Sequence, residues 1–171
     1  MITGRTSLLL QLDEGLLLWC RRLERPLLTR AMRGMTHLAD ASGFVAFAAL
    51  LLAVGEHRAG VTLAYAAGLT AIVVGVLKRV CKRQRPDHAL LGFCSLAENP
   101  DAFSFPSGHT ATAFAVAVAL TESGVPLAAL GLFFASAVGT SRVYLGAHYP
   151  LDVVAGAGLG AAVGLLVRTL S

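Results

Sequence analysis

The sequence predicts an all-α, multi-pass transmembrane helical bundle, and its composition is the first observation behind this prediction. Hydrophobic residues make up 56% of the 171 residues and charged residues only 14%, and the mean hydropathy is +0.69. A soluble domain usually carries about 25% charged residues. A soluble chain of this length exposes too much surface to water to keep so few charges, so a lipid environment is the simpler explanation. The length allows one domain.

The second observation is the distribution of charge, which leaves five apolar stretches after residue 40. We expect about five spanning helices, each of about 15 to 20 residues and somewhat short for a hydrocarbon layer of about 30 Å. They cover residues 41–55, 60–77, 107–122, 126–140 and 150–168. Pro150 occupies a favourable first helical position in the last of them. A polar loop, residues 78–105, separates the second stretch from the third.

Residues 1–38 are amphipathic, with many leucines that alternate with charged residues, and Pro26 divides them into two short helices. Such a segment suits the headgroup region, with leucines in lipid and arginines reaching toward water. We therefore predict an amphipathic interfacial segment over 1–38 and a transmembrane catalytic domain over 39–171. A cytosolic helical hairpin is the alternative for the first segment.

Several classes of function find no support in the sequence. The pI near 9.3 fits juxtamembrane basic residues beside anionic headgroups, and no aromatic residues alternate with basic ones as nucleic-acid binding would favour. The cysteines show neither CxxC nor zinc spacing, and His37, His57 and His88 fit no ligand pattern. Since no acidic pair lies near the residues described next, we predict no metal ion and no cofactor.

Three short segments carry residues suited to phosphate chemistry. The first is Lys78, six residues, then Arg85-Pro86; the second is Pro106-Ser107-Gly108-His109; the third is Ser141-Arg142, five residues, His148, three residues, Asp152. The predicted topology places all three at one membrane face. Transfer of a phosphoryl group depends mostly on positioning and fixed positive charge. Lys78, Arg85 and Arg142 supply such charge, whereas Arg79, Lys82 and Arg83 are interpreted as interfacial anchors.

The second and third segments supply the other groups that this chemistry needs. Ser107 and Gly108 open an apolar helix, where unpaired backbone N–H groups favour an anion and glycine permits close approach. His109 and His148 lie at the ends of different helices. Asp152, four residues after His148, can accept a proton from one ring nitrogen and leave the other free to attack.

In this order the three segments resemble the signature of the type 2 phosphatidic acid phosphatase (PAP2) superfamily, with no departure between Lys78 and Asp152. The resemblance implies that His148 becomes phosphorylated and that His109 is first the general acid and then the base for water. It implies a metal-independent lipid phosphatase whose phosphate is bound by Lys78, Arg85, Ser107, Gly108 and Arg142. Its candidate substrates are phosphatidic acid, phosphatidylglycerol phosphate, undecaprenyl pyrophosphate and other prenyl phosphates.

Two alternatives to this enzyme stay open. The same fold could pass phosphate to a lipid or sugar acceptor, or the chain could be a non-catalytic membrane scaffold. A haloperoxidase is remote, because those relatives are soluble and bind vanadate. For the substrate's lipid tail, Phe93, Phe103 and Phe105 are candidate lining residues, although loop aromatics are more often interfacial anchors.

The last apolar stretch and the basic residues bear on partners and orientation. Gly156, Gly160 and Gly164 form a smooth stripe for close helix packing, within the chain by default and in a homodimer as the alternative. All but Arg58 and Arg168 of the 14 Lys and Arg residues fall on the catalytic side. The positive-inside rule therefore favours the cytoplasmic face of the cell (inner) membrane. Many bacterial relatives are taken to act on the outer face, which is the competing assignment.

Overall fold

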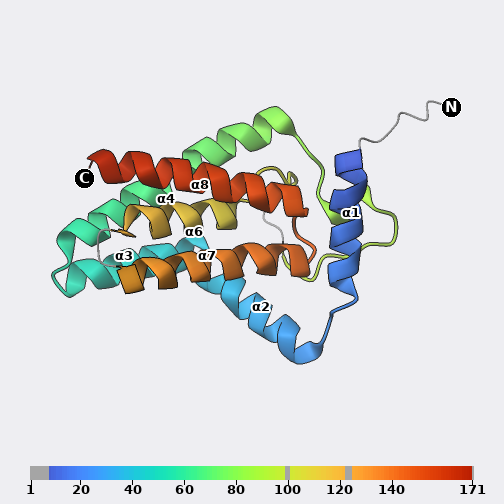
Figure 1. The fold of residues 1–171 in the computed structure, drawn as a ribbon, viewed down its shortest axis with the longest axis horizontal. Coiled ribbons are helices and arrows are strands. Elements are labelled where there is room, and N and C mark those ends of the chain that lie inside the picture. The colour runs from blue at the N-terminus through green and yellow to red at the C-terminus, as the bar shows by residue number, and fades with distance from the viewer. Residues whose placement is uncertain (1–7, 99–100, 122–124, 171) are drawn as a thin grey trace.

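The computed structural model describes residues 8–98, 101–121 and 125–170, and the regular structure in these ranges is helical (Figure 1), which confirms the all-α prediction. One isolated β-bridge joins Gln84 and Phe103. The helices are α1 (Leu8–Arg21), α2 (Pro26–Leu38), α3 (Ala41–Ala53), α4 (His57–Cys81), α5 (Pro86–Ala89), α6 (Gly108–Ala119), α7 (Val125–Tyr144) and α8 (Pro150–Leu170). Residues 122–124, where we expect the third apolar stretch to end, lie outside the described residues.

Helix α6 is the centre of the bundle and packs against α4, α7 and α8 (Figure 1). Its buried face is mostly alanine, which lets the neighbouring helices come close. The closest approach is to the glycine stripe of α8. A Cβ atom at Gly156, Gly160 or Gly164 would overlap or crowd backbone carbonyl oxygens of residues 107, 111 and 115. Packing within the chain is therefore confirmed, and these glycines are not free to meet a second copy.

The number of spanning helices differs from the prediction. Three helices, α4, α7 and α8, are long and apolar enough to cross a membrane, and α2 with α3 forms a fourth candidate that is bent by 57°. Helix α6 has 12 residues, about 18 Å of helix, which is too short to cross alone. It is surrounded by other helices and seven of its residues are buried, so it does not need to span lipid. The chain is a multi-pass membrane protein, as expected, and its described residues hold three or four candidate spans where we expect about five.

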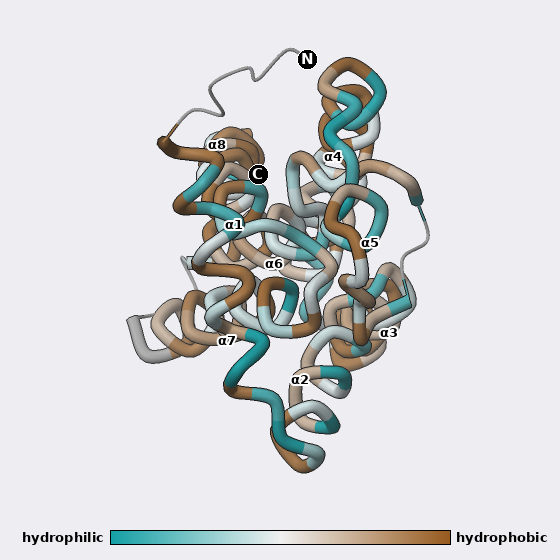
Figure 2. Tube along the Cα trace, turned by 90° about the vertical axis from the view of Figure 1, so that its right-hand side faces the viewer, coloured by the Kyte–Doolittle hydropathy of each residue, from teal (hydrophilic) through white to brown (hydrophobic). Residues whose placement is uncertain are grey.

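The N-terminal segment forms the two short helices that Pro26 predicts. Helix α1 lies across one end of the bundle (Figure 1), with Leu17 buried against α7 and α8 residues while most of its other leucines are exposed. Helix α2 packs against α7, where Thr36 Oγ1 lies 3.0 Å from Ser141 Oγ. Figure 2 views this end directly and shows hydrophilic and hydrophobic stretches alternating along α1 and α2.

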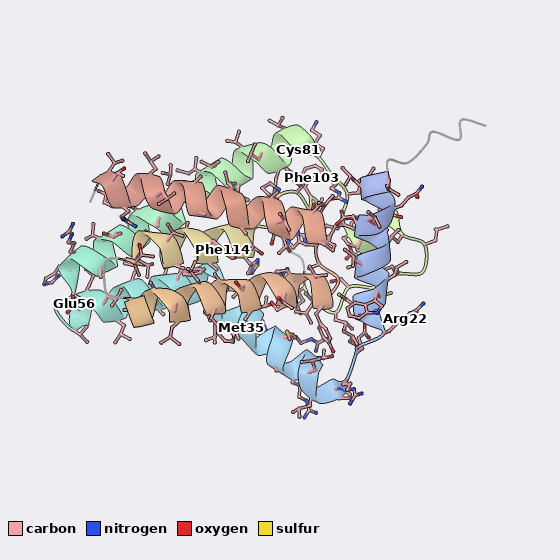
Figure 3. The ribbon with its side chains drawn as sticks, viewed as in Figure 1. Arg22, Met35, Glu56, Cys81, Phe103 and Phe114 are labelled. Atoms are coloured by element: carbon pink, nitrogen blue, oxygen red, sulfur yellow. The ribbon has the colours of Figure 1, made fainter. Side chains whose placement is uncertain are left out.

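The segments that resemble the phosphatase signature meet at the end of the bundle that α1 covers. This end holds the C-termini of α4 and α7 and the N-termini of α6 and α8 (Figure 1). In Figure 3, Cys81 and Phe103 lie at this end, and Glu56 lies at the opposite one. The prediction that these segments share one face is confirmed, and the end with Cys81 is called the catalytic end below.

Candidate active site

Three cations reach the catalytic end from three different elements. Lys78 is in the last turn of α4, Arg85 directly precedes α5, and Arg142 is in the last turn of α7. Arg85 and Arg142 are each only 1% exposed. Because a buried charge is costly unless it is paired, the partners of these side chains indicate what the site is built to hold.

The carboxylate of Asp101 pairs with two of the cations. Lys78 Nζ donates to Asp101 Oδ2 at 2.7 Å, and Arg85 Nη2 donates to Asp101 Oδ1 at 2.8 Å. Arg85 also donates from Nε to the Asp101 carbonyl and from Nη1 to the Ala147 carbonyl, both at 2.8 Å. Burial by itself would raise the pKa of Asp101, but Lys78 and Arg85 outweigh it and lower that pKa below its ordinary value. Asp101 is therefore an ionised bridge between two predicted phosphate ligands.

Arg142 has no such partner among the residues that the structure describes. Its Nε, Nη1 and Nη2 atoms are all buried and make no hydrogen bond there. A buried charge that has lost its partner costs on the order of 3 to 5 kcal/mol. The planar guanidinium fork matches two oxygens of a phosphate. Arg142 is therefore suited to receive an anion from outside the chain.

His148 lies in the link between α7 and α8 and is fully enclosed, with 1% exposure. Its Nδ1 donates a hydrogen bond to the Ser104 carbonyl at 2.7 Å. A carbonyl can only accept, so the proton is on Nδ1 and the lone pair is on Nε2. This Nε2 lies 3.3 Å from Arg85 Nη1. Burial, together with the charges of Arg85 and Arg142, lowers the pKa of His148 to about 3. The imidazole is neutral at ordinary pH, as a nucleophile must be.

Asp152 is near His148 but does not make the expected hydrogen bond. Its Oδ2 is 3.8 Å from His148 Nδ1, which is too long for one. Oδ2 instead accepts from the Tyr149 backbone N–H at 2.9 Å, at the first turn of α8. The prediction that Asp152 accepts the ring proton is wrong, because the Ser104 carbonyl already has this role.

The Ser107 segment is at the N-terminus of α6, as predicted. Ser107 occupies the N-cap position, but its hydroxyl lies 2.9 Å from Thr110 Oγ1 and makes no capping bond to the backbone. Its N–H donates to the Asp152 carbonyl at 3.0 Å, which joins α6 to α8. A Cβ on Gly108 would meet only Val74, at 3.6 Å. Steric demand within the described residues therefore does not explain this glycine, whereas close approach of a phosphate would.

These positions coincide with a family pattern that covers most of the chain. The PAP2 superfamily profile matches residues 59–171, a range that contains all three signature segments. The chain belongs to the PAP2 superfamily.

Several relatives of this PAP2 chain are named as phosphatases. It is 34% identical to decaprenylphosphoryl-5-phosphoribose phosphatase of Mycobacterium tuberculosis over 86% of the chain and 83% of that relative. It is 30% identical to phosphatidylglycerophosphatase B of Bacillus subtilis, over 91% and 81% respectively.

Two solved structures are similar. The transmembrane PAP2-type phosphatidylglycerolphosphate phosphatase from Bacillus subtilis has a TM-score of 0.85 with 28% identity, covering 97% of this chain and 87% of that one. Aquifex aeolicus LpxE has a TM-score of 0.82 with 26% identity, covering 99% of both chains. The chain is thus a PAP2-type membrane phosphatase.

Arg83 is part of the site although it is outside the PAP2 signature. Its Nη1 donates to Asp152 Oδ1 at 2.7 Å and its Nη2 to Asp13 Oδ2 at 2.6 Å. Asp13 Oδ1 accepts from the Leu151 N–H at 2.8 Å, so α1 is tied to the start of α8. The interpretation of Arg83 as an interfacial anchor is wrong. An aspartate that shares the buried side of α1 with Leu17 is the signal that could have indicated this contact.

Asp40 is a second site residue that sequence reasoning missed. It lies at the junction of α2 and α3, and its Oδ1 is 2.6 Å from His109 Nε2. Its Oδ2 is 3.1 Å from His37 Nδ1. An ionised carboxylate can only accept, so the Nε2 of His109 carries a proton and Nδ1 is the free ring nitrogen. His37, to which we assign no chemistry, is an exposed partner of Asp40.

The remaining predictions concern aromatic residues and metals. Phe93 is partly buried, packs against Leu17 and Tyr149, and covers Gly146, so it contributes to a small core, and its role in lining the lipid tail stays a prediction. Phe103 and Phe105 are half-buried. Among the described residues, no three His, Cys, Asp or Glu side chains gather as a metal site would require.

Proposed function

We propose that this PAP2 chain hydrolyses the phosphate monoester or pyrophosphate of a lipid held in the same membrane, by a phosphohistidine route that needs no metal ion. The observation that carries the proposal is the buried guanidinium of Arg142, whose three nitrogens make no hydrogen bond with a described residue. It lies at the same end as a neutral imidazole whose unprotonated Nε2 is 3.3 Å from Arg85 Nη1. An anion receptor beside a nucleophile is what phosphoryl transfer requires.

In the first step, the lone pair on His148 Nε2 attacks phosphorus and the bond from phosphorus to the leaving oxygen breaks. The proton on Nδ1 stays in its bond to Ser104, so the imidazole gains positive charge as the new bond forms. Lys78, Arg85 and Arg142 stabilise the charge on the phosphoryl oxygens. His109, when doubly protonated, gives its Nδ1 proton to the leaving oxygen.

In the second step, water replaces the imidazole. His109 Nδ1, now a lone pair, takes a proton from water, the water oxygen attacks phosphorus, and the nitrogen–phosphorus bond breaks to release phosphate. Burial and the charge of Arg142 lower the pKa of His109 to about 4, and the Asp40 carboxylate opposes this shift. Asp40 therefore supports both steps by favouring the protonated His109 that the first step needs and the second restores. The 2.6 Å contact to Nε2 also directs Nδ1 away from Asp40.

The substrate class follows from the place of the site and from the relatives. The site is at the end of the membrane-spanning helices α4, α7 and α8, where a lipid headgroup would lie with its tails in the bilayer. The names of the relatives give prenyl-linked phosphoribose, phosphatidylglycerophosphate and lipid A as substrates. Each of these molecules is a lipid that carries a phosphate, and they differ in the chemical group that joins the phosphate to the lipid. A lipid phosphate is therefore the proposed substrate, and phosphatidic acid, prenyl phosphates and prenylphosphoryl-5-phosphoribose belong in the first panel.

The test measures phosphate release from this panel in detergent micelles. Wild type should hydrolyse at least one lipid without added metal, and His148→Ala should leave almost no turnover because it removes the nucleophile. His57→Ala is the matched control, since His57 is exposed at the opposite end of the bundle. If His148→Ala kept a rate close to that of the control, the proposed route would be wrong.

We also propose that the catalytic end faces the cytoplasm. Arg58 and Arg168 belong to elements at the opposite end, and the α1, α2 and 78–85 cations lie at the catalytic end, which is the distribution that the positive-inside rule describes. Cys94 is exposed on the catalytic side. An impermeant maleimide applied to intact cells should spare a variant that keeps only Cys94 and label a Glu56→Cys variant that lacks the native cysteines. The reverse pattern would place the site on the outer face.

A further inference from the structure

The position of Asp101 has no explanation in the reaction itself. Its two carboxylate oxygens accept from Lys78 and Arg85, the two cations that pair with an anion already present in the chain. We propose that Asp101 is an internal anion that occupies the Lys78–Arg85 part of the phosphate site and gives way only to a more highly charged phosphate. This inference rests on the proposed function, because it assumes that these cations bind the substrate.

The contacts of Asp101 are those that a substrate phosphate would make. Distances of 2.7 and 2.8 Å are typical of charge-assisted hydrogen bonds. The same Arg85 guanidinium that holds the carboxylate through Nη2 approaches His148 Nε2 through Nη1 at 3.3 Å. The carboxylate thus lies on the arginine nearest to the nucleophile, and a phosphate that presents its oxygens to this arginine competes with it.

The structure also shows how Asp101 can release the two cations. Its side chain is 42% exposed and lies in an irregular segment, so it can turn toward water. Its backbone carbonyl is held separately by Arg85 Nε at 2.8 Å. Rotation of the side chain breaks two ion pairs and the hydrogen bond that Oδ1 accepts from the Phe103 N–H at 3.2 Å, and it leaves this backbone contact in place. Arg142, which has no internal partner among the described residues, is available to the incoming phosphate throughout.

The consequence is selectivity among the phosphates of a membrane. A bilayer surrounds the site with phosphodiester headgroups, each with a single negative charge, whereas the terminal phosphate of a monoester carries nearly two. Lys78 and Arg85 attract an incoming monoanion no more strongly than they attract the Asp101 carboxylate, but they attract a dianion more strongly. Asp101 therefore excludes phosphodiesters and admits phosphomonoesters, and it is a specificity-determining residue rather than a catalytic one.

The experiment compares Asp101→Asn with wild type and with Glu98→Gln, which removes one charge from the same loop. Glu98 is exposed and makes no hydrogen bond or ion pair with the described residues. Three quantities are measured in micelles: the KM for the lipid phosphate, the inhibition constant of inorganic phosphate, and inhibition by phosphatidylglycerol, a phosphodiester. Asp101→Asn should lower the inhibition constant of phosphate about tenfold, the size of one charge-assisted hydrogen bond. It should also make phosphatidylglycerol an inhibitor, whereas Glu98→Gln should behave as wild type.

If Asp101 only held Lys78 and Arg85 in place, the substitution would change phosphate binding in the opposite direction. In that case Asp101→Asn weakens phosphate binding and raises KM, and this result, or no change, would overturn the inference. Asp101→Ala removes the same charge and should agree with Asp101→Asn in direction, which guards against an effect of the amide. Calorimetric titration of each protein with phosphate tests the inference without turnover. If wild type hydrolysed no lipid, the proposed function would fail. The titration would still show whether loss of the Asp101 charge strengthens or weakens phosphate binding.

Discussion

Replacing Arg83 by glutamine should destabilise the fold far more than an interfacial anchor would. The side chain is held between the carboxylates of Asp13 and Asp152, which are both 0% exposed. Its guanidinium also lies over the Tyr149 ring, 4.0 Å from the centroid. Burial alone would lower the pKa of Arg83, but these two carboxylates raise it above its ordinary value, so the ion pairs favour the charged form.

The magnitude follows from what the substitution leaves behind. Glutamine cannot neutralise either carboxylate, and removing one partner of a buried pair costs about 3 to 5 kcal/mol. Loss of the contact with the tyrosine ring adds about 0.5 to 1 kcal/mol. Arg83 is 22% exposed, so water reaches part of the site and the lower end of the sum, about 3.5 kcal/mol, is expected. Turnover should fall as well, since Asp152 then loses the cation that fixes it, but KM should change little because Arg83 is not a predicted phosphate ligand.

The assay is unfolding of the purified protein in detergent, with Arg79→Gln as the control. Arg79 is exposed on the last turn of α4, a few residues before Arg83, so its loss should cost less than about 0.5 kcal/mol. Adding Asp13→Asn to Arg83→Gln should recover part of the loss, because one of the two unpaired carboxylates is then gone. Equal stability of Arg83→Gln and Arg79→Gln would refute the reasoning and return Arg83 to the role of an anchor.

Three further predictions concern pH, packing and metal ions. The pKa of His148 falls from 6.5 to about 3 on folding, so the unfolded chain takes up a proton that the folded protein does not. Between about pH 6.5 and about pH 3, stability should then fall by up to about 1.4 kcal/mol per pH unit, a dependence that thermal melts of His148→Asn should lack. Gly160→Ala should lower both stability and turnover, because its Cβ would overlap the Ala111 carbonyl, whereas Gly158→Ala meets nothing within 4 Å and should be neutral or slightly stabilising in the same melts. Phosphate release should continue in EDTA, and loss of activity that Mg²⁺ restores would contradict the metal-independent route.

The sequence was sufficient to predict those parts of the site that depend on helix ends. Lys78 and Arg142 end helices, and His109 begins one, so an alternating topology brings all three to the same end of the bundle. Helix number was harder to predict, because a short helix such as α6 can be apolar either from contact with lipid or from burial by its neighbours. Composition does not distinguish the two, and the buried alanines of α6 show that the second applies.

Some residues of the site could not be predicted from the sequence, because they reach it through contacts that no local sequence pattern indicates. Asp13 meets Leu151 across 138 positions, and Asp40 meets His109 across 69. Each depends on how a short N-terminal helix folds back over the bundle, and this is set by packing of the whole chain. Asp101 belongs to a loop without periodicity, where sequence indicates polarity but not which cation a carboxylate reaches.

Asp152 shows how a correct residue can be given an incorrect role. A spacing of four places Asp152 beside His148, but the N-terminus of α8 offers the backbone N–H of Tyr149, and this donor takes the carboxylate oxygen that the imidazole would need. The Ser104 carbonyl then fixes the tautomer. What remains for Asp152 is its charge, 3.8 Å from Nδ1, and a phosphorylated His148 is a cation at that position. We therefore expect Asp152 to act in the intermediate more than in the free enzyme, and Arg83, which donates to its other oxygen, holds the carboxylate near the ring.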